Sequence, residues 1–164
     1  ILDFEKIVAE INPESGLKLS DVDHMTGRSR VTSPILIAED SPLLGKMLMD
    51  CLKRAGFTNI DITNNGKECW DKLTDYEHRG VLDQKVACVI TDIEMPQMDG
   101  HHLTKLIKSD DKMAHIPVVI FSSLINDEMR KKGESLGADM QLSKPEIGQL
   151  VEAIDQILGI NEQA

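Results

Sequence analysis

The chain has 164 residues, of which 41% are hydrophobic and 28% charged, and 18 Lys and Arg against 28 Asp and Glu give a net charge of −10. This length suits one globular domain with a sizeable core, and no apolar run approaches the ~20 residues of a membrane-spanning helix. The negative balance would repel phosphate backbones and anionic lipid, which argues against nucleic acid as a partner, and the lack of a long apolar run argues against membrane insertion.

The beginning of the chain differs in composition from the rest. It starts at Ile1 rather than at Met, and we expect a piece of a longer protein. Apolar side chains at helical spacing predict an amphipathic helix over residues 1–12, with no partner for its apolar face in its own segment. The Pro, Ser, Gly and Asp of residues 13–33 predict a flexible linker, and we expect the compact domain over 34–160.

Apolar runs of strand length alternate with helical patterns from Ile35 onward. We expect strands at 35–39, 59–63, 86–91, 117–122 and 140–143, and helices at 43–52, 66–79, 101–108, 126–136 and 146–158. Ser41, Pro42 and Gly56 mark the ends of the first helix as its N-cap, first turn and C-terminal stop. The alternation predicts an α/β fold with right-handed crossovers, in which helices cover both faces of a parallel sheet.

Polar side chains follow four of the expected strands. Glu39 and Asp40 end the first strand, and Asp92 ends the third; Ser122 ends the fourth, and Lys144 follows the fifth. In open parallel sheets, sites form beyond the carboxyl ends of the strands, where the strand order reverses. Moving a charged side chain out of water at this edge destabilises the fold by roughly several kcal/mol, so charged residues there indicate a function. We therefore predict a functional site at this edge.

Carboxylates gathered at one edge repel each other by roughly 4 kcal/mol per pair at ~4 Å and an effective dielectric near 20. A divalent cation offsets this repulsion, and Mg²⁺ prefers an all-oxygen set of a few carboxylates and waters. One carboxylate can then act as a nucleophile toward a phosphoryl group, with Lys144 and Ser122 as hydrogen-bond donors.

Taken singly, these residues have plainer interpretations. Asp40 and Ser122 also fit helix caps, and Lys144 fits a turn before a helix. The functional hypothesis depends on their joint occurrence at the expected strand ends. The three cysteines have no paired or metal-type spacing, which predicts reduced core thiols of a cytosolic protein, and the five histidines are expected at the surface. These residues are Cys51, Cys69 and Cys88, and His24, His78, His101, His102 and His115.

The acidic pair, the stretch DIEMPQMDG from Asp92 to Gly100, the hydroxyl of Ser122 and Lys144-Pro145 together resemble the receiver domain of two-component response regulators. The resemblance covers about 34–160. It implies a doubly wound, flavodoxin-like (βα)5 fold with a five-stranded parallel sheet in the order 2-1-3-4-5.

The resemblance also implies roles for the acidic residues. Asp92 would accept a phosphoryl group from a phosphohistidine of a sensor kinase, forming an acyl phosphate. Asp40, Asp92 and the main-chain carbonyl of Glu94 would hold Mg²⁺, and Glu39 would reach the ion through water. The Glu94 side chain either tunes the lifetime of the phosphate or is a surface residue.

Ser122 and Lys144 would contact the phosphoryl oxygens, with a cis bond between Lys144 and Pro145 as in the family. The domain would be a signalling phosphoacceptor with self-catalysed phosphorylation and dephosphorylation, and not an enzyme. One residue departs from the pattern: Gln141 stands where many receivers carry an aromatic residue that rotates inward.

Two segments resemble a particular group of receivers. Residues 1–12 are similar to the closing helix of a CheW-like coupling domain, and GADMQLSKPEI is similar to the receivers of CheV-type chemotaxis coupling proteins. This resemblance implies phosphotransfer from a CheA-type kinase and attachment to a chemoreceptor array through the coupling domain. The location would be cytoplasmic, at the inner face of the membrane.

Other functions stay open at this point. The chain also fits a receiver from another two-component protein or a phosphate sink. Asp92-Ile93-Glu94 superficially fits a haloacid-dehalogenase-like phosphatase, but in that family the nucleophile follows the first strand and an Asp stands two residues on. A binding module without phosphorylation is a third class, although all core phosphoacceptor positions are filled.

Overall fold

The computed structural model describes residues 29–123, 125–144 and 147–160, and one compact unit spans Arg30–Leu158. The expected helix over 1–12, residues 13–28 of the expected linker and Pro145 lie outside the described residues. None of the helices in the described part is long and apolar enough to cross a membrane.

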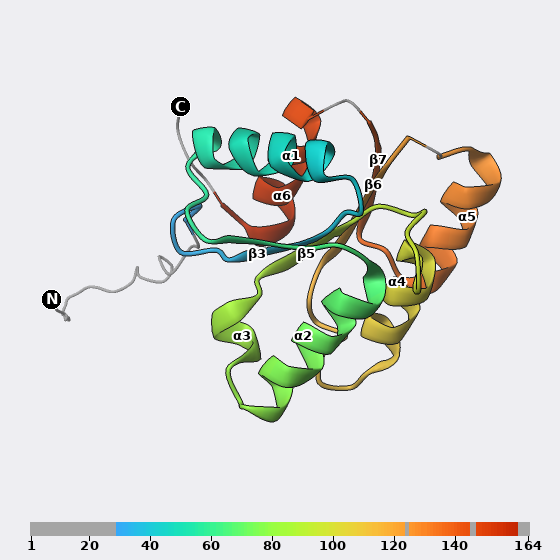
Figure 1. Ribbon diagram of the computed structural model, residues 1–164, viewed down its shortest axis with the longest axis horizontal. Helices are drawn as coiled ribbons and strands as arrows, with labels where there is room; N and C mark the ends of the chain where they lie inside the picture. The colour runs from blue at the N-terminus through green and yellow to red at the C-terminus, as the bar shows by residue number, and fades with distance from the viewer. Residues whose placement is uncertain (1–28, 124, 145–146, 161–164) are drawn as a thin grey trace, which may run out of the picture. The chain divides into compact units, whose positions relative to one another are not determined.

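Five strands form one parallel sheet (Figure 1). They are β3 (Ile35–Ala38), β4 (Ile60–Thr63), β5 (Cys88–Thr91), β6 (Val118–Ser122) and β7 (Met140–Ser143). The order β4-β3-β5-β6-β7 is 2-1-3-4-5 along the chain, which confirms the predicted doubly wound sheet. Every residue of β3, β5 and β6 is buried, as expected for inner strands covered on both faces. The strand order reverses between β3 and β5, so the two strands that end in acidic residues are neighbours.

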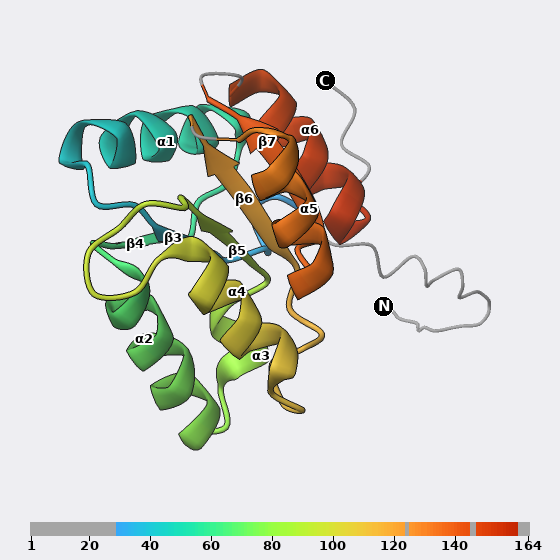
Figure 2. The same cartoon turned by 90° about the vertical axis from the view of Figure 1, so that its right-hand side faces the viewer.

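Helices cover both faces of the sheet (Figures 1 and 2). α1 (Pro42–Ala55) and α6 (Ile147–Leu158) pack together on one face. α2 (Gly66–His78), α4 (Gly100–Ser109) and α5 (Asp127–Leu136) cover the other. The apolar cluster beneath α2 and α4 includes Leu36, Leu73 and Ile107, all nearly inaccessible to solvent.

A short helix, α3 (Leu82–Lys85), was not predicted. It has four residues, and no side chain caps its N-terminus. A segment this short leaves no periodic apolar pattern from which a helix could be predicted.

The predicted ends of the first helix are confirmed in α1. The Ser41 hydroxyl accepts a hydrogen bond from the Leu44 N–H at 3.3 Å, and Pro42 occupies the first turn. Gly56 ends the helix at φ 111°, where its N–H donates to the carbonyls of Leu52 and Lys53.

Arg30 anchors the start of the compact unit. Its guanidinium donates to the Asp155 carboxylate on α6 at 3.1 Å from Nε and to the Ala55 carbonyl at 2.7 Å. It also lies 5.9 Å from the centre of the Phe57 ring. The residues just before β3 are thereby tied to α1 and α6.

All three cysteines are free thiols, as predicted. Cys69 and Cys88 are fully buried, and burial raises the pKa of each to about 12. The surface prediction for the histidines was wrong at His101, which is 4% exposed. It lies in the first turn of α4, and α5 packs against this helix, a contact that the pattern of α4 alone does not show.

Candidate functional site

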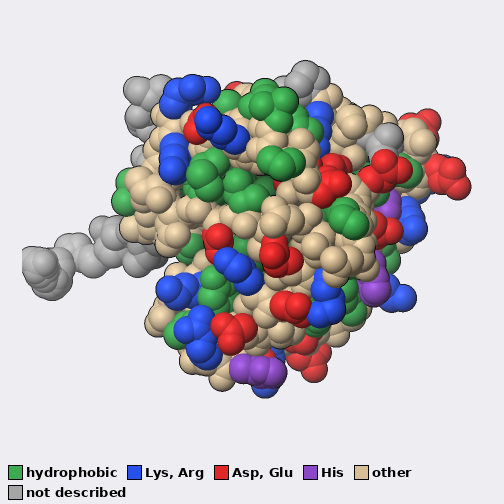
Figure 3. Space-filling model, in the orientation of Figure 1, with side chains coloured by type: hydrophobic (Ala, Val, Ile, Leu, Met, Phe, Trp, Pro, Cys, Tyr) green, Lys and Arg blue, Asp and Glu red, His purple; other side chains and the backbone are tan. Residues whose placement is uncertain are grey.

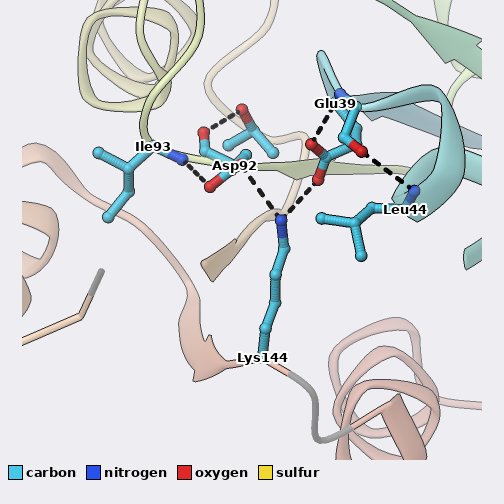
Figure 4. A network of polar contacts seen from close by, with 7 residues as sticks. Glu39, Leu44, Asp92, Ile93 and Lys144 are labelled. Carbon is cyan, nitrogen blue, oxygen red and sulfur yellow. Dashed lines mark hydrogen bonds and ion pairs between the residues drawn. The ribbon is translucent and has the colours of Figure 1, made fainter. Parts of the chain in front are cut away.

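Three charged side chains from distant parts of the chain meet at the carboxyl edge of the sheet (Figure 4). The Lys144 ammonium lies between two carboxylates, 2.7 Å from Oε1 of Glu39 and 3.1 Å from Oδ2 of Asp92. Lys144 follows β7, Glu39 follows β3 and Asp92 follows β5. The predicted convergence of strand ends is therefore present for these three residues.

Backbone groups fix the Asp92 carboxylate. Its Oδ1 accepts a hydrogen bond from the Ile93 N–H at 2.7 Å, which leaves Oδ2 to Lys144. The Asp92 N–H donates to the Ala38 carbonyl at 3.1 Å, and the Thr91 hydroxyl donates to the Asp92 carbonyl at 2.8 Å. The side chain is 12% exposed, so a small anion can reach it from solvent.

Glu39 is the most buried acid of the site, with a side chain that is 2% exposed. Burial raises the pKa of its carboxyl group, although hydrogen bonds from Lys144 and from the Ser41 N–H oppose the shift. Burial alone would lower the pKa of the Lys144 ammonium, but the bond and charge of Glu39 together with Asp92 raise it above its usual value. Lys144 is therefore charged near neutral pH.

The site holds more negative than positive charge. Exposed Asp40 joins Glu39 and Asp92, and oxygens of the three carboxylates lie within 4.8 Å of one another. Among the described residues, the Lys144 ammonium is the cation that pairs with this group, and it contacts Glu39 and Asp92. An all-oxygen set of this kind fits a hard divalent cation such as Mg²⁺ better than a softer metal.

Ser122 and Glu94 lie next to this cluster along the sheet edge and in the loop. Ser122 is fully buried at the end of β6, beside β5, and its carbonyl accepts a hydrogen bond from the Lys144 N–H at 3.1 Å. The helix that follows is capped by Asn126, so capping by Ser122 is not what the structure shows. Glu94 is exposed in the loop after Asp92.

A close backbone contact holds the start of α4 against the acidic strand end. Asp99 caps α4 by accepting a hydrogen bond from the His102 N–H, and the Gly100 N–H donates to the Ile93 carbonyl at 2.8 Å. A Cβ at Gly100 would lie 1.9 Å from the Asp92 carbonyl oxygen, so only glycine fits there.

The loop between β5 and α4 is also pinned to α2. The Gly66 N–H donates to the Met98 carbonyl at 3.1 Å, and a Cβ at Gly66 would lie 2.3 Å from that oxygen. Gln97 adopts φ 68°, a left-handed conformation that costs a side-chain-bearing residue about 1 kcal/mol or more. The loop is thus tightly constrained on both sides.

Sequence reasoning missed the backbone donors of the site. The amides of Ile93 and Ser41 each hold one carboxylate oxygen. Every residue except proline supplies such a donor, so no side-chain pattern marks these two positions. Their role follows only from the conformation of the strand ends.

Gln141 fills the position where an aromatic residue was expected from the resemblance. It is 8% exposed, and its side-chain amide donates to the Arg130 carbonyl on α5 at 2.8 Å. Arg130 in turn donates to the Gln141 carbonyl at 3.2 Å. A Cβ at Gly133 would lie 2.3 Å from Oε1 of Gln141, so this glycine makes room for the buried amide.

The response regulator receiver domain family matches residues 35–155. The chain belongs to this family. It is 35% identical over 162 residues to chemotaxis protein CheV2 of Helicobacter pylori, covering 96% of this chain and 49% of that protein. It is 28% identical over 163 residues to CheV3 of the same organism, covering 98% and 51%. The chain thus spans about half the length of these curated relatives.

Solved receiver structures share the fold. The signal receiver domain of a signal transduction histidine kinase from Syntrophus aciditrophicus superposes with a TM-score of 0.64 at 26% identity, covering 80% of this chain and 95% of that one. Chemotaxis protein CheY4 of Vibrio cholerae gives 0.66 at 21% identity, covering 77% and 99%. The family match, with the acidic pair directly after β3 and Asp92 directly after β5, rules against the phosphatase alternative.

Proposed function

We propose that this chain is the phosphoacceptor receiver of a chemotaxis coupling protein, and that Asp92 takes its phosphoryl group from a phosphohistidine of a CheA-type kinase. The observation that carries this proposal is the Asp92 carboxylate, held by the Ile93 amide and Lys144 beside two further acids. The chemotaxis role is supported by the similarity to CheV2 and CheV3 over nearly the whole chain. A chemoreceptor array and the inner face of the membrane belong to the same proposal.

The oxygen ligands of the site would hold Mg²⁺. Asp40, Asp92 and the carbonyl of Glu94 are the direct ligands in this proposal, and Glu39 acts through water. The bound ion supplies positive charge that offsets the carboxylates and the incoming phosphoryl oxygens. The acidic excess fits this role, because Lys144 alone does not neutralise three carboxylates.

The chain's own residues account for the transfer. An Asp92 carboxylate oxygen forms the new bond to phosphorus while the bond from phosphorus to the donor imidazole breaks, and the leaving imidazole takes a proton. Lys144 and the Ser122 hydroxyl bind the phosphoryl oxygens. Lys144 needs little movement, because its ammonium already contacts Asp92.

The surface beside the site fits a helical donor domain. Leu43 and Met47 lie one turn apart on α1, directly after the acidic pair, and are 70% and 42% exposed. Hydrophobic side chains gather on the face of the molecule where α1 lies (Figure 3). We propose that the phosphohistidine domain packs its own apolar helix face on these residues while its imidazole reaches Asp92.

Phosphotransfer from an autophosphorylated CheA-type kinase tests this function. Labelled phosphate should move to the chain within the mixing time in Mg²⁺, and should not move to Asp92→Asn or in the presence of a chelator. Equal labelling of Asp92→Asn would place the acceptor elsewhere. Transfer only from unrelated histidine kinases would still support a receiver function but would overturn the chemotaxis assignment.

A further inference from the structure

A groove is lined by residues of α4 and α5, two neighbouring helices on the same face of the sheet. Its volume is about 390 Å³. α4 and its cap contribute most of the lining, and α5 contributes the rest; the lining residues are Asp99, His101, His102, Lys105, Lys132 and Leu136. In Figure 3, histidine, basic and acidic side chains lie together at the right-hand edge of the molecule, where these two helices lie.

The groove concentrates positive charge on an acidic protein. Lys105 and Lys132 are both exposed, and within the described residues neither forms an ion pair. Lys108 on the same helix, by contrast, is paired with the Asp139 carboxylate. The acid of the groove, Asp99, already uses one oxygen to cap α4. The lining thus holds two ammonium groups and one carboxylate, and its local charge is positive although the net charge of the chain is −10.

The floor of the groove offers an unused polar atom and an apolar contact. His101 is 4% exposed, and its Nε2 has no hydrogen-bond partner in the described part of the chain. Burial, with the charge of Lys132 added, lowers the pKa of His101, so the ring is neutral at pH 7 and serves as a hydrogen-bonding group. Leu136 is half-buried beside it.

We propose that this groove binds an acidic peptide segment of a partner protein, with carboxylates on Lys105 and Lys132 and an apolar side chain against Leu136. Charge complementarity favours such a segment. A membrane surface is a worse fit, because the net charge of the whole chain opposes approach to anionic lipid, whereas a short peptide meets only the local field. The proposal does not depend on phosphorylation of Asp92.

Amide NMR shifts of the whole chain test the proposal. The probe is an acetylated peptide of alternating Glu-Glu and Leu-Leu pairs, and the comparison peptide carries Lys in place of Glu. The acidic peptide should shift amides in 99–108 and 130–137, with affinity that falls as salt rises. The basic peptide should leave these amides in place.

Charge reversal provides the matched control. Lys105→Glu with Lys132→Glu should weaken binding about 10-fold or more, since both changes replace attraction with repulsion. Lys46→Glu with Lys85→Glu makes the same change in net charge at exposed positions elsewhere and should change affinity less than about 2-fold.

Three results would overturn the proposal. The first is an equal loss of affinity in both double variants, which would mean that only net charge matters. The second is shifts confined to other parts of the chain. The third is saturation of the same amides by inorganic phosphate or phosphatidylglycerol vesicles but not by the acidic peptide. All four substituted lysines are exposed, and unchanged amide dispersion verifies the fold of each variant.

Discussion

Two lysine and carboxylate clusters lie at opposite ends of the same sheet and differ in their charge balance. At the amino ends of β6 and β7, Lys108 donates to the carbonyls of Ala114 and Ile116, at 3.1 and 2.8 Å, and pairs with Asp139 at 2.8 Å. Asp139 also accepts the Val118 N–H at 2.8 Å. Each polar group of this cluster has a partner, and its single positive and single negative charge cancel.

The cluster at the carboxyl ends is not balanced. Lys144 contacts Glu39 and Asp92, and Asp40 adds a third carboxylate. The balanced pair joins α4 to the sheet, whereas the unbalanced one holds an excess of negative charge that a cation and a phosphoryl group can use. Both clusters contain lysine and carboxylate groups, and the surplus of carboxylates is what distinguishes the proposed phosphoacceptor site from the balanced pair.

The largest expected difference is between Lys144→Met and Lys108→Met. Loss of Lys144 should slow phosphorylation about 100-fold, the usual effect of removing one donor to a charged transition state. It should also lower stability in a way that Mg²⁺ restores, because the acids then face each other without a cation. Loss of Lys108 leaves two partly buried carbonyls without this donor and should lower the free energy of unfolding by about 1–3 kcal/mol, with or without Mg²⁺.

Urea unfolding with and without Mg²⁺, together with phosphorylation rates, measures both halves of this prediction. Rescue of Lys108→Met by Mg²⁺, or normal phosphorylation of Lys144→Met, would remove the distinction between the clusters.

Two glycines, one closely packed and one with open space around it, provide the second test. Gly100→Ala should lower the free energy of unfolding by about 1–3 kcal/mol or more, because a Cβ would collide with the Asp92 carbonyl. Gly148→Ala on α6 meets no atom within 4 Å and should raise stability by up to about 1 kcal/mol through helix propensity. Thermal unfolding measures both variants. If the two changes in stability were equal, the loop between β5 and α4 would have moved to accommodate the added methyl group.

A smaller difference is expected between substitutions of two acids, Asp40 and Asp139. Asp40→Asn should weaken Mg²⁺ binding about tenfold, by loss of one charged ligand. It should also raise stability by up to about 1 kcal/mol, the repulsion of two charges 4 Å apart in water. Asp139→Asn should lower stability and leave Mg²⁺ affinity unchanged. Calorimetric titration with Mg²⁺ checks both variants, and equal weakening in the two would contradict the assignment of Asp40.

The last test concerns the thiols of the core. At pH 8, a thiol reagent should label Cys51 in the folded chain and all three cysteines in urea, since Cys69 and Cys88 are buried with a pKa of about 12. The pKa of these thiols is 9.0 in the unfolded chain and about 12 in the folded one, so the folded state stays protonated to a higher pH. Ionisation therefore favours the unfolded chain, and stability should fall as pH rises from about 9 to about 12. Rapid native labelling of Cys69 would show that the sheet core opens readily.

The fold was largely predictable because its signals are local and repeated. Apolar runs gave the five strands, and Ser41 and Gly56 fixed the ends of α1. The strand ends then predicted that Glu39, Asp92 and Lys144 would meet, since parallel strands share one carboxyl edge.

The remaining features depend on packing or on the backbone, which no side-chain pattern records. The burial of His101 results from α5 packing on α4, and the hydrogen bond from the Ile93 amide results from the turn after β5. The exchange of hydrogen bonds between Gln141 and Arg130 requires the space left by Gly133 on the neighbouring helix.

The most direct test of the central claim is incubation of the chain with acetyl phosphate, followed by intact mass and peptide mapping. We predict one labile phosphoryl group, on Asp92, that forms in Mg²⁺, is absent with a chelator and does not form on Asp92→Asn. A phosphoryl group on another residue, or equal modification without a divalent cation, would contradict the account.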